Sequence, residues 1–366
     1  MELIFVSRFA WPSIGGTEAV VTHIASAMQD GGAAVRVFAH RVDSDGVTWH
    51  GPLDRVPRFP RQVDPATGVS TEQLRLRWGE ALVLRVAGIR GGPRFEWLHE
   101  RLSSRRFADQ FAPADLIHRF GGNRIALATV QAAKRLNVPA VVTPFAHPGQ
   151  WDADEISASA YRDADLVVAT SRADAAVYER LGVPTDRIGI CPLPTGAPAL
   201  GGGRKLLADL GIDGPVVLYL GGRRDYKGVE ELLKAAEILA PDAPDVRFAF
   251  VGPGPALAGA GAGANVFDVG AVTDAQRDAW LDAADVLCLP SSAESFGLAI
   301  SERWSAGVQV VTSDIPVLRE RVTESGGGIV SGREPAALAH AVRSLIDDTQ
   351  LRRQMGQAGH EHWQRT

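Results

Sequence analysis

Two glutamates, Glu294 and Glu302, stand eight positions apart in a segment whose pattern predicts a strand, a loop and a helix. The apolar run at 286–290 predicts a short buried strand, and the apolar residues from 297 onward have helical spacing. Glu294 is therefore expected in the loop, and Glu302 about one and a half turns into the helix. Glutamates are usually ordinary surface residues. Ligands, however, bind α/β sheets where strands end, so this placement points to a site.

The loop between these glutamates offers backbone groups to an anion. The amides of Phe296, Gly297 and Leu298 open the predicted helix, where N–H groups lack partners and the partial charge is positive. Gly297 has no side chain, so a ligand can approach the backbone there. An ionised glutamate accepts hydrogen bonds only, which suits sugar hydroxyls. An anion cradle flanked by two carboxylates therefore predicts a sugar nucleotide as the ligand.

This segment resembles the signature of the retaining glycosyltransferases of family 4, which have the two-domain GT-B fold. In that family a Glu, seven further residues and a second Glu flank a Phe-Gly pair, as Glu294 and Glu302 do here. The resemblance implies that Glu294 and the backbone of 296–298 hold the donor sugar, while Glu302 holds the ribose. It also implies a retaining, hexosyltransferase-like enzyme that moves a sugar from a nucleoside-diphosphate sugar to an acceptor hydroxyl.

A second cluster follows the predicted strand at 216–220, where a glycine pair leads to Arg223, Arg224 and Lys227. Three cations in a glycine-rich loop suit a diphosphate, although surface charge is the plain alternative. The resemblance implies that Lys227 stabilises the leaving diphosphate. The family has an arginine where this chain has Gly222, so Arg223 is predicted as its substitute. With these cations present, no metal and no cofactor are expected.

Three further loops follow predicted strands. Gly15 and Gly16 lack the G-x-G-x-x-G spacing of a nicotinamide-binding fold. A tight turn is the plain alternative. The resemblance implies that they reach the donor phosphate and the acceptor, that Gly252 lies near the nucleotide, and that His147 contacts the donor sugar. The complete prediction comprises catalytic Glu294, His147, Lys227 and Arg223 and donor-binding Gly15, Gly16, Gly222, Gly252, Phe296, Gly297, Leu298 and Glu302.

The order of predicted elements indicates an α/β protein. The segments 162–171 and 282–291 share one pattern, in which an Asp precedes an apolar strand that ends at a Ser. This repeat predicts two doubly wound, Rossmann-like domains that face each other across a cleft. A Pro- and Gly-rich linker sets their bounds, with an acceptor-binding domain at 1–196 and a nucleotide-sugar-binding domain at 197–366. After a helix predicted at 336–346, little chain remains for the helix that usually ends this fold.

The two aspartates of an Asp-x-Asp motif, Asp163 and Asp165, precede a predicted strand. Ligands bind at the opposite, carboxyl end of parallel strands, so both aspartates are predicted to be structural. Cys191 and Cys288 are predicted to be buried in a reducing compartment, and the location is therefore predicted to be cytoplasmic.

Composition narrows the class of partner. A chain of 366 residues suits two α/β domains, and its net charge of −5 argues against nucleic acid. No apolar run reaches the length of a membrane span. The basic segment 85–106 is compatible with contact at a membrane surface, but its interspersed acidic residues favour a solvated helix. The expected partners are a nucleotide-sugar donor, such as a UDP-sugar, and a small-molecule, glycan or lipid-linked acceptor.

Several alternatives remain open on the sequence. A sugar-nucleotide epimerase or a glycan phosphorylase would share the fold. A dinucleotide oxidoreductase and a non-catalytic protein that binds nucleotides or carbohydrates belong to other classes. Release of free UDP or GDP only in the presence of an acceptor separates a transferase from the epimerase and the phosphorylase. Failure to bind NAD or NADP would remove the oxidoreductase, and turnover would exclude the non-catalytic protein.

Overall fold

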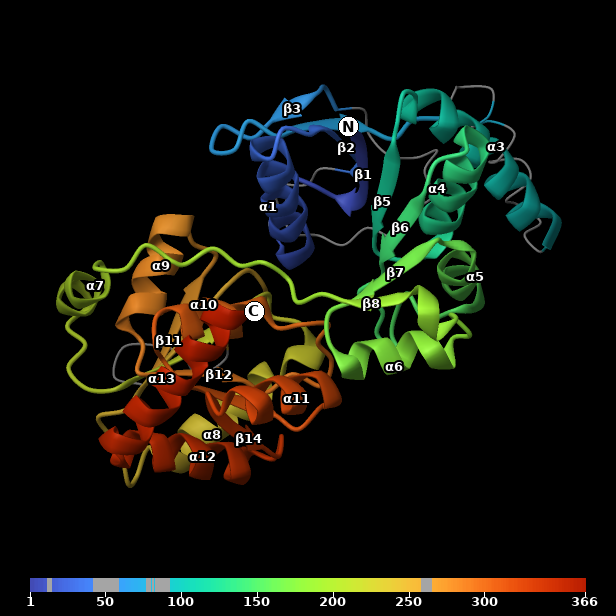
Figure 1. Ribbon diagram of the computed structural model, residues 1–366. Helices are drawn as coiled ribbons and strands as arrows, with labels where there is room; N and C mark the ends of the chain where they lie inside the picture. Colours follow the sequence, from blue (N-terminus) through green and yellow to red (C-terminus); the bar gives the residue numbers. More distant parts are fainter. Residues whose placement is uncertain (12–14, 42–58, 77–79, 81, 83–92, 258–264) are drawn as a thin grey trace. The chain divides into compact units, whose positions relative to one another are not determined.

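A computed structural model describes the chain except for residues 12–14, 42–58, 77–79, 81, 83–92 and 258–264. It divides into two compact units, unit 1 at Met1–Pro194 and unit 2 at Thr195–Thr366 (Figure 1). Each unit has one largely parallel sheet with helices packed against it, which confirms the predicted α/β class. The roles assigned to the two units stay predictions.

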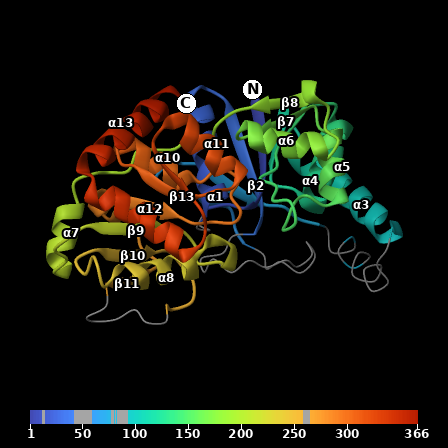
Figure 2. The same ribbon diagram turned by 90° about the horizontal axis from the view of Figure 1, so that it is seen from below.

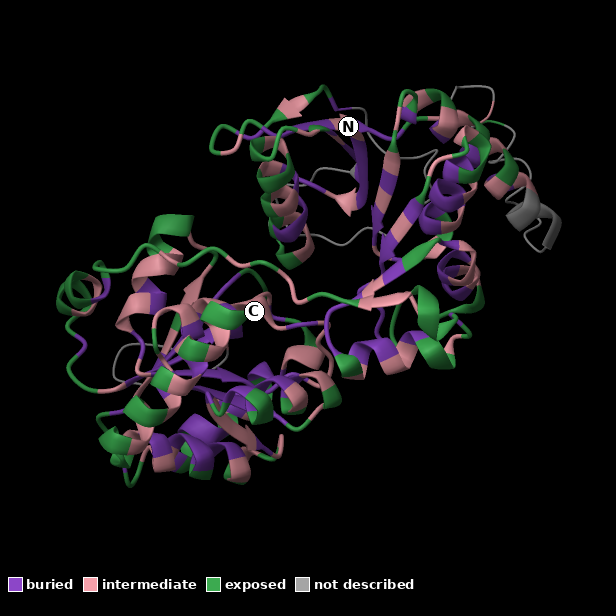
Figure 3. Cartoon of the chain, in the orientation of Figure 1, coloured by how far each residue is buried: buried purple, intermediate pink, exposed green. Residues whose placement is uncertain are grey.

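Unit 1 is built on an eight-stranded sheet in the order β3-β4-β2-β1-β5-β6-β7-β8. Its strands are β1 Glu2–Phe9, β2 Ala34–Arg41, β3 Gln62–Val63, β4 Ser70–Gln73, β5 Leu116–Phe120, β6 Ala140–Thr143, β7 Leu166–Ala169 and β8 Ile188–Ile190. Its helices are α1 Gly16–Asp30, α3 Pro93–Phe111, α4 Asn123–Leu136, α5 Glu155–Asp163, α6 Arg172–Arg180 and the short 3₁₀ helix η2 Thr185–Arg187. The central strand β1 is apolar and buried along most of its length because helices cover a parallel sheet on both faces (Figure 3).

Unit 2 has a six-stranded parallel sheet in the order β11-β10-β9-β12-β13-β14. Its strands are β9 Val216–Leu220, β10 Arg247–Val251, β11 Val266–Gly270, β12 Val286–Leu289, β13 Val310–Ser313 and β14 Gly328–Ser331. Its helices are α7 Gly203–Leu210, η3 Asp225–Lys227, α8 Val229–Leu239, α9 Asp274–Ala283, α10 Leu298–Ser305, α11 Pro316–Ser325, α12 Pro335–Asp347 and α13 Thr349–Arg365. Figure 2 shows β9, β10 and β11 side by side.

Alternate residues of the unit 2 strands face two separate apolar clusters. Val217 and Tyr219 of β9 pack with Leu232 of α8 in one cluster. Val216 and Leu218 pack in the other cluster, which includes residues of α9 and α10. This alternation follows from the two-residue period of a strand. The pairing of β9 with β12 then brings together the loops at their carboxyl ends.

Helix α13 is a structure that the sequence does not predict. Gly359 of α13 lies so close to Trp304 of α10 that an added Cβ would come within 2.3 Å of the indole ring. Trp363 on the same helix donates a hydrogen bond of 3.2 Å to Thr195 Oγ1. The helix is therefore anchored within unit 2 by close packing at a glycine, which a search for apolar periodicity overlooks.

Two predictions about single residues have different outcomes. Cys288 is buried as predicted, but Cys191 is exposed just after β8, so the prediction for Cys191 was wrong.

The aspartates of the Asp-x-Asp motif have structural partners: Asp163 accepts a hydrogen bond from Gln131, and Asp165 accepts one from the backbone of Ala140, each within 2.8 Å.

The structure describes only part of the basic segment 85–106. Residues 85–92 lie outside the described part of the chain, and the rest belongs to α3. None of the described helices is both long and apolar enough to span a bilayer.

Candidate active site

The loops that follow β9 and β12 meet closely at Gly228. This glycine has a φ of 72°, in the left-handed region, and lies between η3 and α8. An added Cβ would come within 2.2 Å of the carbonyl oxygen of Pro290, which directly follows β12. The amide of Ser292 also donates a hydrogen bond of 2.7 Å to Tyr226 O. Glycine is therefore required here on two counts, its backbone angle and the proximity of the second loop.

This close approach places Lys227 against Glu294. Lys227 Nζ lies 2.6 Å from Glu294 Oε1, and Ser291 Oγ donates to the same oxygen at 2.8 Å. Burial lowers the pKa of Lys227, but the attraction of Glu294 and Tyr226 outweighs it, so the pKa lies above its usual value. The ammonium of Lys227 is therefore charged at neutral pH. The ammonium has three donors and the carboxylate has a second oxygen, so both retain capacity for a ligand.

The turn that precedes α10 is the predicted anion cradle. Gly297 has a φ of 77° and is the N-cap of α10, while Phe296 is buried. Gly297 has no side chain with which to cap the helix, so ligand oxygens or water can take the first amides of α10. A Cβ at Gly297 would lie 3.1 Å from Ile300 and 3.3 Å from Leu318, closer than ordinary contact. Both the backbone angle and the packing favour glycine.

Arg321 on α11 contacts this turn and holds it in place. This role was not predicted from the sequence. Its guanidinium stacks on the Phe296 ring at 3.6 Å, and its nitrogens donate to the carbonyls of Phe296 and Gly297. A further hydrogen bond of 2.6 Å reaches Ser301 Oγ. Burial lowers the pKa of Arg321 to about 9, although the charge of Glu294 opposes that shift. The available signal was a charged residue between Leu318 and Val322 on the buried face of a helix.

Replacing Arg321 with methionine is expected to lower the free energy of unfolding by about 2 kcal/mol, because two carbonyls and a hydroxyl lose a buried donor. The rate of sugar transfer should fall by a larger factor than the affinity for the nucleotide, because the substitution displaces the turn at Phe296 and Gly297. Arg319→Met is the matched control, because Arg319 lies on the same helix in an exposed pair with Asp314. Urea unfolding decides the point. Equal stability of Arg321→Met and the wild type would show that the turn does not depend on this side chain.

Arg223 is directed into unit 2. Its terminal nitrogens donate to the carbonyls of Pro255 and Phe250, at 2.9 and 3.1 Å, and to the carboxylate of Asp268. The hydrogen bond from Arg223 lowers the pKa of Asp268. These contacts join the loop after β9 to β11 and to the loop after β10. That Arg223 also stabilises a diphosphate stays a prediction.

Of the two predicted glycines in these loops, Gly252 is required for steric reasons, whereas a Cβ at Gly222 would meet only ordinary contact. Gly252 has a φ of 136°, and an added Cβ would come within 2.1 Å of Gly221 O. The backbones of the two loops are therefore in direct contact. Gly222, which stands where the family has arginine, accepts a hydrogen bond of 2.9 Å at its carbonyl from the hydroxyl of Tyr219.

Glu302 lies on α10 as predicted, with a different partner from Glu294. Arg277 of α9 donates to its carboxylate. Burial raises the pKa of Glu302, and the charge of Arg277 opposes that shift. A ribose at this position would therefore meet a carboxylate that an arginine already orients.

The remaining predicted residues, His147, Gly15 and Gly16, belong to unit 1. His147 is buried in the loop after β6, where its amide donates 2.9 Å to Trp151 O and its ring packs on the Trp151 indole. Gly15 and Gly16 open α1 and are exposed. An added Cβ at Gly15 would come within 2.2 Å of the carboxylate of Glu18, so that side chain lies over the glycine.

A polar cluster near the ends of β1 and β5 was also missed. Arg119 is fully buried and donates to the carbonyls of Val6 and Gly122, at 3.2 and 3.1 Å. The amide of Gly122 donates 3.0 Å to Asp152. Burial raises the pKa of Asp152, against the charges of Arg119 and Arg8. The buried Arg119 and the half-buried Asp152 hold the loop after β5 in place, and their separation along the chain concealed them.

Comparison with known families assigns both units. The family described as glycosyl transferase 4-like domain matches residues 15–194, and the family described as glycosyl transferases group 1 matches residues 206–362. Together the two matches span most of the chain.

Curated relatives match a shorter region. The D-inositol 3-phosphate glycosyltransferase of Paenarthrobacter aurescens is 29% identical over 222 residues, which are 55% of this chain and 54% of the relative. The phosphatidyl-myo-inositol mannosyltransferase of Mycobacterium leprae is 34% identical over 189 residues, which are 49% of this chain and 46% of the relative. The matched region is thus about half the length of these curated relatives.

Solved structures match over the whole chain. HepE from Anabaena in complex with UDP-glucose has a TM-score of 0.75 at 18% identity, covering 100% of this chain and 95% of HepE. Sucrose-phosphate synthase from Thermosynechococcus elongatus has a TM-score of 0.72 at 21% identity, covering 100% of this chain and 94% of the synthase. At such identities the likeness establishes a shared fold.

Proposed function

Because the chain belongs to the family 4 glycosyltransferases and has their GT-B fold, we propose that it transfers a sugar from a nucleoside-diphosphate sugar to an acceptor hydroxyl with retention. The observation that supports this most is the charged pair of Lys227 and Glu294. It lies where two neighbouring strands end, which is where α/β sheets bind ligands.

In the proposed reaction the bond between the anomeric carbon and the diphosphate breaks, and negative charge builds on the leaving group. Lys227 and the first amides of α10 stabilise that charge. Glu294 accepts hydrogen bonds from the sugar hydroxyls and orients the ring. The acceptor oxygen attacks from the face that the diphosphate leaves, and its proton passes to the leaving phosphate. No protein nucleophile, metal or cofactor enters this scheme.

The donor and the acceptor are proposed by class. HepE was solved with UDP-glucose, which supports a UDP-sugar donor bound by unit 2. The two relatives are named for D-inositol 3-phosphate and for phosphatidyl-myo-inositol, which makes a phosphorylated polyol, free or lipid-linked, the first acceptor to test on unit 1. The cytoplasmic location remains part of this proposal.

Turnover tests the proposal. The protein is incubated with UDP-glucose or GDP-mannose, alone or with D-inositol 3-phosphate or vesicles of phosphatidyl-myo-inositol, and nucleoside diphosphate is measured by chromatography. We expect release that depends on the acceptor and an α-linked product by nuclear magnetic resonance. If a donor releases nucleoside diphosphate at the same rate whether or not either acceptor is present, transfer to these acceptors is contradicted. A β-linked product would contradict retention alone.

A further inference from the structure

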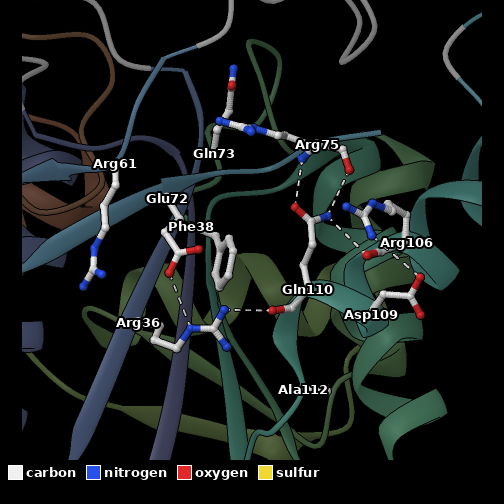
Figure 4. A pocket seen from close by; sticks show the side chains of 10 residues that line it. All are labelled: Arg36, Phe38, Arg61, Glu72, Gln73, Arg75, Arg106, Asp109, Gln110 and Ala112. Carbon is white, nitrogen blue, oxygen red and sulfur yellow. Dashed lines mark hydrogen bonds and ion pairs between the residues drawn. The ribbon is translucent and has the colours of Figure 1, made fainter. Parts of the chain in front are cut away.

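Unit 1 contains an open pocket of about 520 Å³ in which none of the predicted site residues takes part (Figure 4). It lies beside β2 and β4, against the last turns of α3. Its lining residues are Arg36, Phe38, Arg61, Glu72, Gln73, Arg75, Arg106, Asp109, Gln110 and Ala112. Four arginines face two carboxylates, so the lining has an excess of two positive charges.

The arginines around this pocket, which we call the arginine pocket, are held by few contacts. Arg36 donates a hydrogen bond of 3.0 Å to Gln110 O, and its Nε lies 3.5 Å from the Glu72 carboxylate. Arg61 donates a hydrogen bond of 2.9 Å to Ser70 Oγ, and Arg75 donates one of 3.1 Å to Phe59 O. Each contact occupies one or two nitrogens of a group with five N–H donors. Within the described part of the chain, most of these donors have no protein acceptor.

Arg106 shows the deficit most clearly. Its Nε is buried and has no hydrogen-bond partner among the residues that the structure describes. Its Nη1 lies 3.8 Å from Asp109, which is an ion pair without a hydrogen bond. A buried donor without a partner is costly, and because solvent does not reach this Nε, a ligand in the open pocket would contact the terminal nitrogens of Arg106. Figure 4 shows Arg75 and Arg106 on either side of Gln110, the residue whose carbonyl Arg36 contacts.

We propose that the arginine pocket binds the phosphate group of a phosphorylated ligand, at a site separate from the donor site. Guanidinium groups match phosphate oxygens in pairs, and a phosphate monoester carries the charge that would balance this lining. The volume is within the range of small-molecule sites. The same monoester is found in a free phosphate ester and in the headgroup of phosphatidic acid. The inference does not depend on the proposed transferase function.

The test uses the full chain and two probes, free glycerol phosphate and vesicles that contain phosphatidic acid. The pocket variant is Arg61→Gln/Arg75→Gln, because both side chains are exposed and each makes a single described side-chain hydrogen bond. The control is Arg180→Gln on α6, an exposed arginine of the same unit outside the pocket. Circular dichroism and thermal midpoints verify folding. If the double variant is unstable, Arg75→Gln alone replaces it.

Wild type and control are expected to bind at least one probe, and the pocket variant is expected to bind it at least about tenfold more weakly, since it loses charge-assisted hydrogen bonds. Binding of free glycerol phosphate would identify a soluble ligand, and binding of vesicles alone would identify a headgroup. UDP affinity should be equal in all three proteins, which separates this site from the donor site. Equal affinity of pocket variant and wild type for both probes, or binding of neither, would overturn the proposal.

Discussion

Lys227→Met is expected to slow sugar transfer by about a hundredfold, the usual effect of removing one group that stabilises transition-state charge. The reason is positional. Its ammonium is held 2.6 Å from Glu294, beside the turn that opens α10, and its pKa lies above the usual value. The charge is thus in place before the diphosphate develops its own. Affinity for UDP should also fall, because the product carries the same diphosphate. Steady-state kinetics and calorimetry measure both effects.

Two further variants make this prediction specific. Lys234→Met is the matched control, since Lys234 is exposed on the neighbouring helix α8. Lys227→Met leaves Glu294 without its cation, which destabilises a partly buried carboxylate. Lys227→Met/Glu294→Gln should therefore recover stability without recovering turnover. If Lys227→Met retains the wild-type rate and UDP affinity, Lys227 does not contact the diphosphate.

Glu294→Gln and Glu302→Ala are expected to fail in different ways. Glu294 lies in the loop, on Lys227 and Ser291, where it would orient the sugar. A small displacement there costs chemistry, so kcat should fall by about a hundredfold with little change in UDP affinity. Glu302 lies on α10 and would hold the ribose, which is bound equally in ground and transition states. Its loss should chiefly raise KM and weaken UDP binding.

The partner of Glu302 calls for its own control. Arg277 donates to the Glu302 carboxylate, so Glu302→Ala also leaves Arg277 with only its 3.7 Å ion pair to Asp278. Arg277→Met separates the two effects: it removes the arginine and leaves the carboxylate for the ribose. UDP should bind this variant more tightly than it binds Glu302→Ala. If instead Glu294→Gln loses UDP affinity and Glu302→Ala keeps it, the assignment is reversed, and the nucleotide lies at Glu294 and the sugar at Glu302.

The sequence was sufficient for the local elements of the donor region. Continuous apolar runs predicted β9 and β12, and helical spacing after Gly297 predicted α10. The contact between Lys227 and Glu294 was not predictable from spacing, because 67 residues separate them and only the pairing of β9 with β12 brings them together. The family resemblance, and not the spacing of the residues, placed Lys227 and Glu294 in one site.

Side-chain direction was the harder part. Arg223 follows a strand end as a ligand-binding cation would, yet its guanidinium contacts Asp268 and two carbonyls within unit 2. Arg321 was overlooked although it supports the predicted cradle, because a lone charge on a helix gives no sign of what it faces. Cys191 was assigned to a core because its neighbours are apolar, but β8 is the outermost strand of its sheet.

A crystal structure of this protein with UDP tests the central claim most directly. The account predicts the diphosphate within hydrogen-bond distance of Lys227 Nζ and of the first amides of α10, with the ribose hydroxyls on Glu302. A diphosphate bound elsewhere in the protein, for example in the arginine pocket, with Lys227 still paired to Glu294 alone, would contradict it.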